Sequence, residues 1–418
     1  MECFLGMRCR KLCFIFILIY AADGGLDWRE IGIFAVQYYR VAGAESGNIG
    51  GELQKLDLTT GEVTMLKNYG YQTRGLYSIA VADDGTLYAV SSGHRLGHVC
   101  PFGKDLMVVS RDEGETWSSP MIVNDTYLDD RDAGLVVWGD NMLLTWFNHP
   151  ESLLNMETPK PFYVLRTPLA LGMKDYLKDI PEEEKPYGSF TRISRDGGKT
   201  WSEPRRSPVS APHGPIRKKD GTLFYLGREF YNMGKGNEFG KIKAYVSRDD
   251  GETWEYLSTV PPHEELEKGF VEPHVCQLPD GTLIGALRIS IEDYPGRLRT
   301  YTTFSYDDGK TWTQPEALEG VYGSTPHFLL HSSGALIMVY QRRRVDPQGQ
   351  YARISRDGGK TWGKDFLVSP VAPDWDHGYP SSVELANGDI FTVYYQKTEG
   401  DSYPSLLGTR WNLDEEPK

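Results

Sequence analysis

The sequence predicts an all-β protein, a six-bladed β-propeller in a single domain. Three observations predict this fold: an eight-residue motif that recurs five times, six hairpin units along the chain, and a spacing of 53 to 60 residues between most units. Propeller blades are four-stranded antiparallel sheets repeated around an axis. With 418 residues, of which 39% are hydrophobic and 12% aromatic, the chain can bury such a core.

The eight-residue motif reads S-R-D-E-G-E-T-W at its first occurrence and varies little in the other four. Its Asp can bond its own backbone, its Gly supplies a positive φ, and its Thr-Trp pair re-enters a strand. The Trp is a large anchor for packing between neighbouring hairpins. The five motifs begin at Ser110, Ser194, Ser247, Ser305 and Ser355.

Between these motifs lies a fainter repeat, in which an alternating strand is followed by a tight turn and a second strand. Asp-Gly and Asn-Gly are strong short-range hairpin signals, and six such units suit the inner hairpins of six blades. The turns are Asp84-Gly85, Gly139-Asp140, Asp220-Gly221, Asp280-Gly281, Ser333-Gly334 and Asn387-Gly388.

Two parts of the chain depart from this regular spacing. The 82-residue gap between Gly139 and Gly221 contains an insertion over 150–188, predicted as a loop with one short helix. The sixth unit lacks the octamer, and we expect its outer strands to come from Leu406–Leu413 and from the N-terminal segment 30–68.

Charge and cysteine content exclude several classes of function. The net charge of −13 argues against a nucleic-acid partner, which needs a basic face. Cys100 and Cys276, the two cysteines outside the N-terminal region, are too few for a disulfide framework and are predicted to be inert core thiols. The sequence shows no metal-ligand spacing and no nucleotide-binding loop, so we expect neither a metal nor an organic cofactor.

Residues 1–22 are predicted to be a leader, and residues 23–418 the propeller. Basic residues precede an apolar run, Leu12–Ala22, that is too short to span a bilayer but suits a signal-peptide core. We therefore expect export to the periplasm, cell surface or medium. If the leader is not a signal peptide, a cytoplasmic protein is the alternative. No other stretch is apolar and long enough to cross a membrane.

Equivalent positions in the six units point to a common pocket on the propeller axis. The residue nine positions before the turn glycine is Glu272 in unit four, Tyr379 in unit six and Asp130 in unit two. Because equivalent repeat positions lie at equivalent radii, these three side chains should meet. The same count gives Leu76, Pro212 and Thr325 in units one, three and five.

Arginines occupy the other arm of the same hairpins. Seven residues after the turn glycine lie Arg228 in unit three and Arg288 in unit four, and unit five offers Arg342–Arg344 one to three residues further on. A hairpin brings its two ends together, so these arginines should return to the end of the propeller that holds Glu272 and Tyr379.

The five octamers on six hairpin units resemble the Asp-boxes of the sialidase (neuraminidase) superfamily, over residues 70–412. The resemblance implies a Tyr nucleophile paired with a Glu, and three arginines that bind the carboxylate of the sugar. Glu272 precedes Arg288 by 16 residues, and Arg342–Arg344 precede Tyr379 by about 35, both similar to the family spacing. Tyr379 thus resembles the nucleophile, Glu272 its partner, and Arg288 with one of Arg342–Arg344 the carboxylate clamp.

The N-terminal half departs from the family pattern. Arg74 is displaced from the place of the first family arginine, and the stretch 93–98, where the family has its acid/base Asp, holds no carboxylate. Asp130, Asp132 or His98 could take that role. Asp130 and Asp132 flank Arg131, which would lower their pKa values unless one of them is buried. The remaining candidates for substrate binding are Arg95, Arg131, Arg228, His213, His274 and His327.

These residue types suit the hydrolysis of an acidic sugar. A neutral Tyr hydroxyl avoids repulsion from the carboxylate on the anomeric carbon, a Glu can take its proton, and arginines match a carboxylate with a planar fork. Structural interpretations stay open, with Glu272 as the ion-pair partner of Arg288 and the histidines as packed inner-strand residues. Three functions follow: a retaining exo-sialidase, a propeller enzyme acting on a different acidic glycan, and a non-catalytic glycan-binding propeller.

Overall fold

The computed structural model confirms the all-β fold, with six antiparallel sheets arranged as a six-bladed propeller. It describes residues 77–95, 100, 103–149, 175–229, 241–263, 269–289, 299–397 and 404–415, and four strands nearer the N-terminus. Leu76, Arg74 and His98 lie outside the described residues, as does most of the predicted leader, whose removal stays a prediction.

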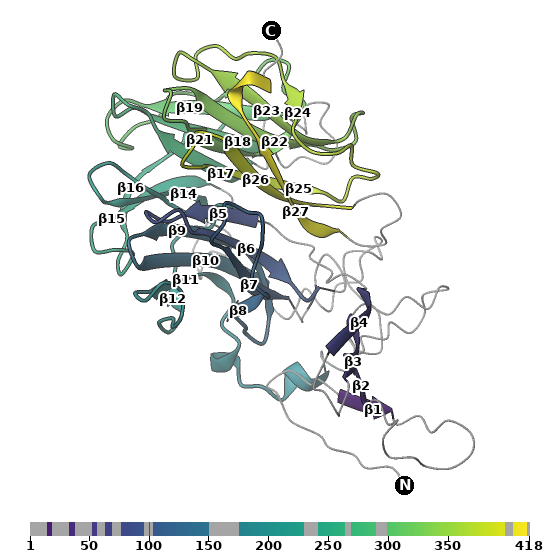
Figure 1. Ribbon diagram of the computed structural model, residues 1–418. Helices are drawn as coiled ribbons and strands as arrows, with labels where there is room; N and C mark the ends of the chain where they lie inside the picture. Colours follow the sequence, from purple (N-terminus) through teal and green to yellow (C-terminus); the bar gives the residue numbers. More distant parts are fainter. Residues whose placement is uncertain are drawn as a thin grey trace, which may run out of the picture.

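Each blade is a consecutive run of strands (Figure 1). Blade 1 has β5 (Tyr77–Val81), β6 (Leu87–Gly93), β7 (Lys104–Ser110) and β8 (Met121–Asn124), and blade 2 has β9 (Asp129–Trp138), β10 (Asn141–His149), β11 (Gly188–Ser194) and β12 (Arg205–Arg206). Blade 3 has β13 (Ile216–Arg217), β14 (Leu223–Arg228), β15 (Ile242–Ser247) and β16 (Glu255–Thr259), and blade 4 has β17 (Phe270–Gln277), β18 (Leu283–Ile289), β19 (Thr300–Ser305) and β20 (Glu316–Ala317). Blade 5 has β21 (Ser324–Leu330), β22 (Leu336–Arg342), β23 (Gly349–Ser355) and β24 (Phe366–Leu367), and blade 6 has β25 (Gly378–Glu384), β26 (Ile390–Gln396) and β27 (Ser405–Trp411).

The sixth blade differs from the prediction. Its third strand, β27, comes from the C-terminus as expected, but the sheet has three described strands. The N-terminal segment instead forms a sheet of its own, so the prediction that residues 30–68 complete blade 6 is wrong. That sheet consists of β1 (Ile15–Leu18), β2 (Ile33–Gln37), β3 (Glu52–Leu56) and β4 (Val63–Asn68).

The blades close into a ring through their inner strands, which are the first strand of most blades and the second strand, β14, in blade 3. β5 packs against β9, β14 against β17, β17 against β21, β21 against β25, and β25 returns to β5. Between blades 2 and 3 the backbones meet directly: a Cβ on Gly134 would lie 2.4 Å from Gly214 N, so only glycine fits there. These inner strands thus converge on the axis, where the sequence predicts the pocket.

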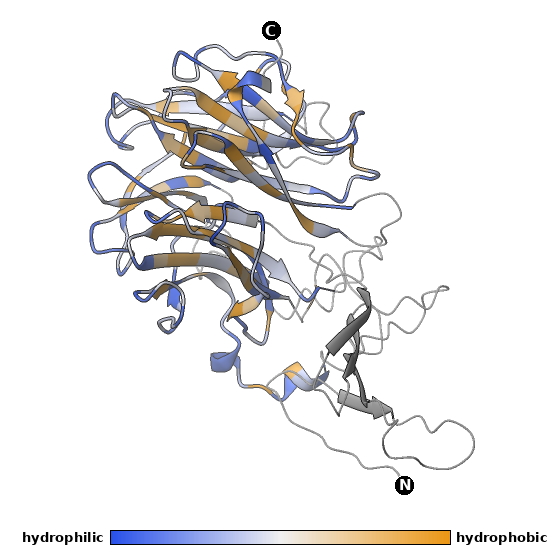
Figure 2. Ribbon diagram, viewed as in Figure 1, coloured by the Kyte–Doolittle hydropathy of each residue, from blue (hydrophilic) through white to orange (hydrophobic). Residues whose placement is uncertain are grey.

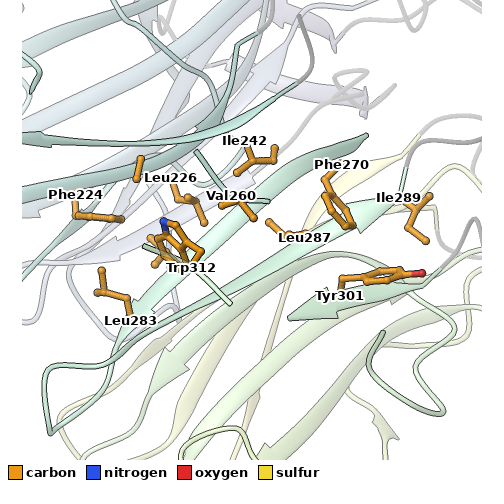
Figure 3. Close-up of a cluster of buried hydrophobic side chains, with 12 residues drawn as sticks. Phe224, Leu226, Ile242, Val260, Phe270, Leu283, Leu287, Ile289, Tyr301 and Trp312 are labelled. Carbon is orange, nitrogen blue, oxygen red and sulfur yellow. The ribbon is translucent and has the colours of Figure 1, made fainter. Parts of the chain in front are cut away.

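The core lies between neighbouring blades. Figure 2 shows apolar residues concentrated in the strands and hydrophilic residues in many of the connecting loops. Figure 3 shows the cluster between blades 3 and 4, where Phe224 and Leu226 face Leu283 and Leu287. Trp312, the Trp of the fourth octamer, packs into this cluster and donates a hydrogen bond to Ser258 Oγ at 3.0 Å. This confirms the predicted role of that Trp as an anchor.

The octamers fold as the turn chemistry predicts. In the first one, Asp112 accepts hydrogen bonds from Thr116 N at 2.9 Å and from Ser110 Oγ at 2.7 Å. Its glycine, Gly114, has φ +90° and lies against the Phe391 ring of the neighbouring blade 6. A side chain at Gly114 would therefore separate two blades.

Other predictions concern the insertion and the cysteines. The described end of the insertion holds a helical turn at 175–178 and a 3-10 helix, η3 (Glu182–Glu184), in line with a loop and short helix. Cys100 and Cys276 are both buried, and neither forms a disulfide with another described residue. Burial raises the pKa of Cys276 to about 12, so its thiol is unreactive as predicted. No helix among the described residues is long and apolar enough to span a membrane.

Candidate active site

A backbone bulge that recurs in four blades directs four side chains toward a common site. Asp132, Glu272, Thr325 and Tyr379 all have positive φ, between 48° and 60°. Each lies on the first strand of its blade at a β-bulge, where the register with the second strand shifts. A positive φ costs a non-glycine residue conformational free energy, and a bulge changes the direction in which its side chain points. Blades 2, 4, 5 and 6 therefore share one means of directing a residue out of the regular strand alternation.

Glu272 and Tyr379 meet as the sequence predicts. Tyr379 Oη donates a hydrogen bond to Glu272 Oε1 at 2.9 Å, although the two residues lie in blades 4 and 6. Arg288, at the end of β18, bridges them: its Nη1 donates to Glu272 Oε2 and, at 3.0 Å, to Tyr379 Oη. The side chains of Glu272 and Arg288 are 15% and 22% exposed, so a ligand can reach this cluster.

The charges of this cluster shift the pKa values of its members. Burial raises the pKa of the Glu272 carboxyl, but the Arg288 guanidinium, the hydrogen bond from Tyr379 and the Arg343 charge together outweigh burial and hold the pKa below its usual range. Burial and the Glu272 charge raise the pKa of Tyr379. The site therefore holds an ionised carboxylate beside a neutral phenol, which is the state that a Tyr nucleophile and its base require.

Asp132 completes the cluster from blade 2. Burial and, to a smaller extent, the Glu272 charge together raise its pKa to about 7 against the opposing charge of Arg131. Asp132 in turn raises the pKa of Tyr379, which places the three groups within electrostatic range of one another. A carboxyl with a pKa near 7 can carry a proton at neutral pH and donate it.

Asp130, the residue found by the nine-residue count, has different contacts. It is fully buried, and its carboxylate accepts hydrogen bonds from Thr126 N at 2.6 Å and Thr126 Oγ1 at 2.7 Å. The hairpin of blade 2 closes with two residues between paired positions, whereas that of blade 4 closes with five. The turn glycine of blade 2 is therefore two residues nearer to the bulge than that of blade 4, so the residue equivalent to Glu272 is Asp132.

The arginine cluster of blade 5 divides between two environments. Arg343 Cζ lies 5.5 Å from the centroid of the Tyr379 ring, and its Nη2 donates to Tyr395 Oη at 2.7 Å. Arg342 instead pairs with Asp365 and stacks over the Tyr351 ring at 3.9 Å. Arg342 is the last residue of β22 and Arg343 follows it, and consecutive side chains of an extended chain point to opposite sides. Of the two predicted binding residues, Arg343 lies beside Tyr379, and Arg342 is held by Asp365.

The other predicted arginines lie as follows. Arg95 is 1% exposed and forms an ion pair with Asp129 at 2.6 Å, which gives it a structural place behind β9. Arg131 lies between Asp129 and Asp132, at 3.5 and 3.6 Å. Arg228 is half-buried at the end of β14, in the position that Arg288 has in β18, since each forms the last pair with the third strand.

His213, His274 and His327 form a packed cluster. The rings of His274 and His327 stack with centroids 4.3 Å apart, and His213 lies 5.4 and 4.9 Å from them. All three are less than 9% exposed. Burial and the neighbouring rings hold the pKa values of His274 and His327 well below their usual range, so both are neutral near pH 7. These contacts match the structural interpretation, in which the histidines fill the core. Among the described residues no cluster of His, Cys, Asp and Glu could hold a metal ion.

Thr325, Gln341 and Tyr395 also contact the site, although the sequence pattern predicted no role for them. Gln341 and Tyr395 each lie seven residues after a turn glycine, as Arg288 does. Gln341 Oε1 accepts a hydrogen bond from Tyr379 N at 3.0 Å, and Thr325 Oγ1 donates to Glu272 Oε2 at 3.4 Å. The seven-residue count that found Arg228 and Arg288 could therefore also have found Gln341 and Tyr395.

Comparison with known proteins agrees with this architecture. The family model described as BNR repeat-like domain matches residues 222–413, and the BNR/Asp-box repeat model matches residues 192–203. A search of curated proteins gives no match.

Solved structures share the fold at low sequence identity. A protein of unknown function from Dyadobacter fermentans superposes with a TM-score of 0.65 at 20% identity, covering 83% of this chain and 96% of its own. The NanB sialidase of Streptococcus pneumoniae gives a TM-score of 0.60 at 14% identity, covering 85% and 71%. The intramolecular trans-sialidase of Ruminococcus gnavus, solved with oseltamivir carboxylate, gives 0.57 at 15% identity, covering 82% and 96%.

Proposed function

Because the chain is a sialidase-like BNR-repeat propeller, we propose that it is a retaining exo-α-sialidase, a glycoside hydrolase that releases a terminal sialic acid or a related acidic sugar from glycans. The observation that supports this most is the 2.9 Å hydrogen bond from Tyr379 to Glu272. It pairs a nucleophile with a base, which a non-catalytic glycan-binding propeller does not require.

In the first step, Tyr379 Oη attacks the anomeric carbon while its proton passes to Glu272. The bond between that carbon and the leaving oxygen breaks, and Asp132 donates its proton to that oxygen. The phenol is neutral before attack, so the carboxylate on the anomeric carbon does not repel it.

In the second step, water replaces the tyrosine on the anomeric carbon. Asp132, now ionised, takes a proton from the water, and Glu272 returns its proton to Tyr379 Oη as the bond between tyrosine and sugar breaks. Two displacements at the same carbon retain its configuration. All three groups end in their starting protonation states.

Arg288 and Arg343 supply positive charge for the sugar carboxylate. Among the hydrogen bonds of the described residues, Arg288 uses only Nη1, which leaves Nη2 for a ligand. Arg343 Cζ lies 5.5 Å from the centroid of the Tyr379 ring. Arginines remain charged at all relevant pH values and match a carboxylate with two parallel donors.

The pKa of Asp132 predicts the pH dependence of turnover. The mechanism needs Asp132 protonated, so kcat/KM should fall as pH rises through about 7, where Asp132 loses its proton. The acid limb, set by protonation of Glu272, should lie below the usual pKa of 4.5. A pH profile of Asp132→Asn should lack the alkaline limb and retain activity mainly on aryl glycosides, whose leaving group needs no acid. Asp130→Asn should keep the limb; loss of it there would assign the acid to Asp130.

A different acidic sugar is the second candidate. It is favoured by the position of Asp132 on the first strand of blade 2, since the stretch 93–98 after unit one contains no carboxylate. The test is sugar release from a panel of α-linked sialosides and of glycans that end in uronic acids, with products identified by mass. Release of sialic acid alone supports the sialidase, and release of only the uronic acid supports the second candidate. Binding without release would reject both.

A further inference from the structure

Gln341 lies behind the nucleophile, fully buried next to the end of β22, and its amide links Thr325 and Tyr379, two of the four residues with positive φ at the first-strand bulges. Its Oε1 accepts a hydrogen bond from Tyr379 N at 3.0 Å, and its Nε2 donates to Thr325 Oγ1 at 2.9 Å and to Ser324 Oγ at 3.1 Å. We propose that Gln341 is the positioning residue of the site, holding the Tyr379 backbone and orienting the Thr325 hydroxyl toward Glu272. This inference rests on the proposed function.

The Tyr379 amide needs an acceptor because of its bulge. The register between β25 and β26 shifts between Gly378 and Ser381, which takes Tyr379 out of the regular ladder of blade 6. Gln341, on the neighbouring blade, supplies the acceptor for its buried N–H. Without this bond the bulge can relax toward a regular strand, and a one-residue change of register turns a side chain to the opposite face.

The fit of the amide to this bulge is close. A Cβ on Gly378 would lie 1.3 Å from Gln341 Oε1, so the amide occupies the space that any side chain before Tyr379 would need. Gly378 also has φ +146°. The backbone around the nucleophile is therefore shaped to receive this one side chain.

The second arm of the amide acts on the base. Because Gln341 Nε2 donates to Thr325 Oγ1, the hydroxyl hydrogen of Thr325 is directed to another acceptor, and Glu272 Oε2 lies 3.4 Å away. A hydrogen bond donated to a carboxylate favours its ionised form. Gln341 thus contacts the nucleophile directly and its base through one hydroxyl.

Gln396 provides a matched control for substitution. It is also a fully buried glutamine with three hydrogen bonds, but its partners are Pro370 O, Ser369 Oγ and Gln350 Nε2. In Gln341→Met we expect kcat to fall about 100-fold with KM changed less than about threefold, since misplaced reacting groups cost rate rather than binding. The acid limb of the pH profile should also move to higher pH. Gln396→Met should keep kcat within about threefold of the wild type.

Hydrogen exchange and two further variants complete the experiment. Exchange of the Tyr379 amide, measured without substrate, should accelerate in Gln341→Met and not in Gln396→Met. Gln341→Glu keeps an acceptor for Tyr379 N and should recover part of kcat. If the Met variant does not fold, Thr325→Val, which keeps the β-branched shape, should still move the acid limb upward.

Equal losses of kcat in the two Met variants, or an effect of Gln341→Met on KM alone, would overturn the positioning role. Failure of the proposed function is recognised separately. It appears as normal turnover in Tyr379→Phe, whatever the Gln341 variants do.

Discussion

Replacing Tyr379 with Phe should lower kcat for sugar release by roughly 10³-fold or more, as expected when a catalytic nucleophile is removed. The ring, its stacking against Tyr395 at 6.2 Å and the shape of the pocket are retained. Only the oxygen that bonds Glu272 and Arg288 is lost. The free energy of unfolding should change by at most about 2 kcal/mol, the scale of one hydrogen bond to a charged group.

Tyr395→Phe is the matched control for this variant. It removes a hydroxyl from the ring stacked on Tyr379, but that hydroxyl bonds Arg343 and not Glu272. Its loss should therefore be far smaller, roughly tenfold or less. A fluorinated sialyl inhibitor should label Tyr379 covalently, as peptide mapping would show. Label on Asp130 or Asp132, or near-normal turnover of Tyr379→Phe, would reject the Tyr mechanism.

Replacing Arg343 with Ala should weaken binding of a carboxylated sugar by about 2–4 kcal/mol, or roughly 30- to 1000-fold in Kd. The guanidinium lies over the Tyr379 ring and is held there by Tyr395 Oη and by His377 O, each at 2.7 Å. Truncation of this side chain removes both the electrostatic attraction to the sugar carboxylate and the hydrogen-bond donors that orient it. Calorimetry with a sialic acid analogue measures the difference.

Two comparisons make this result specific. Arg342→Ala removes the adjacent charge, but Arg342 is paired with Asp365, so binding should change little. The amide of the same sugar should lose much less affinity than the acid in Arg343→Ala and in Arg288→Ala. If acid and amide weaken equally, these arginines do not bind the carboxylate.

The repeats explain why so much of the fold could be predicted. Each octamer is a local turn whose Ser, Asp and Thr bond one another, so its structure depends on a few adjacent residues. The glycine count found Glu272 and Tyr379 because blades 4 and 6 have hairpins of the same length. It selected Asp130 in place of Asp132 because turn length varies between blades, and a count cannot detect that without the pairing register.

Burial and side-chain direction account for the rest of what sequence could not predict. The alternatives for the acid remained open because the effect of burial on the pKa of Asp132 opposes that of its neighbour Arg131. Arg342 and Arg343 are adjacent in sequence, and only the strand alternation separates their partners. The N-terminal strands pair with one another, a long-range choice that no local motif signals.

The shared bulge at Asp132, Glu272, Thr325 and Tyr379 also bears on how such a pocket can change. In these four blades the backbone bulge, and not the identity of the side chain at it, sets the direction in which the residue points. Thr325 lies at the same kind of bulge as the proposed acid, base and nucleophile, but its side chain carries only a hydroxyl. A single replacement there would alter the chemistry of the pocket and leave the ring intact. The fold thus separates the evolution of its reactivity from that of its architecture.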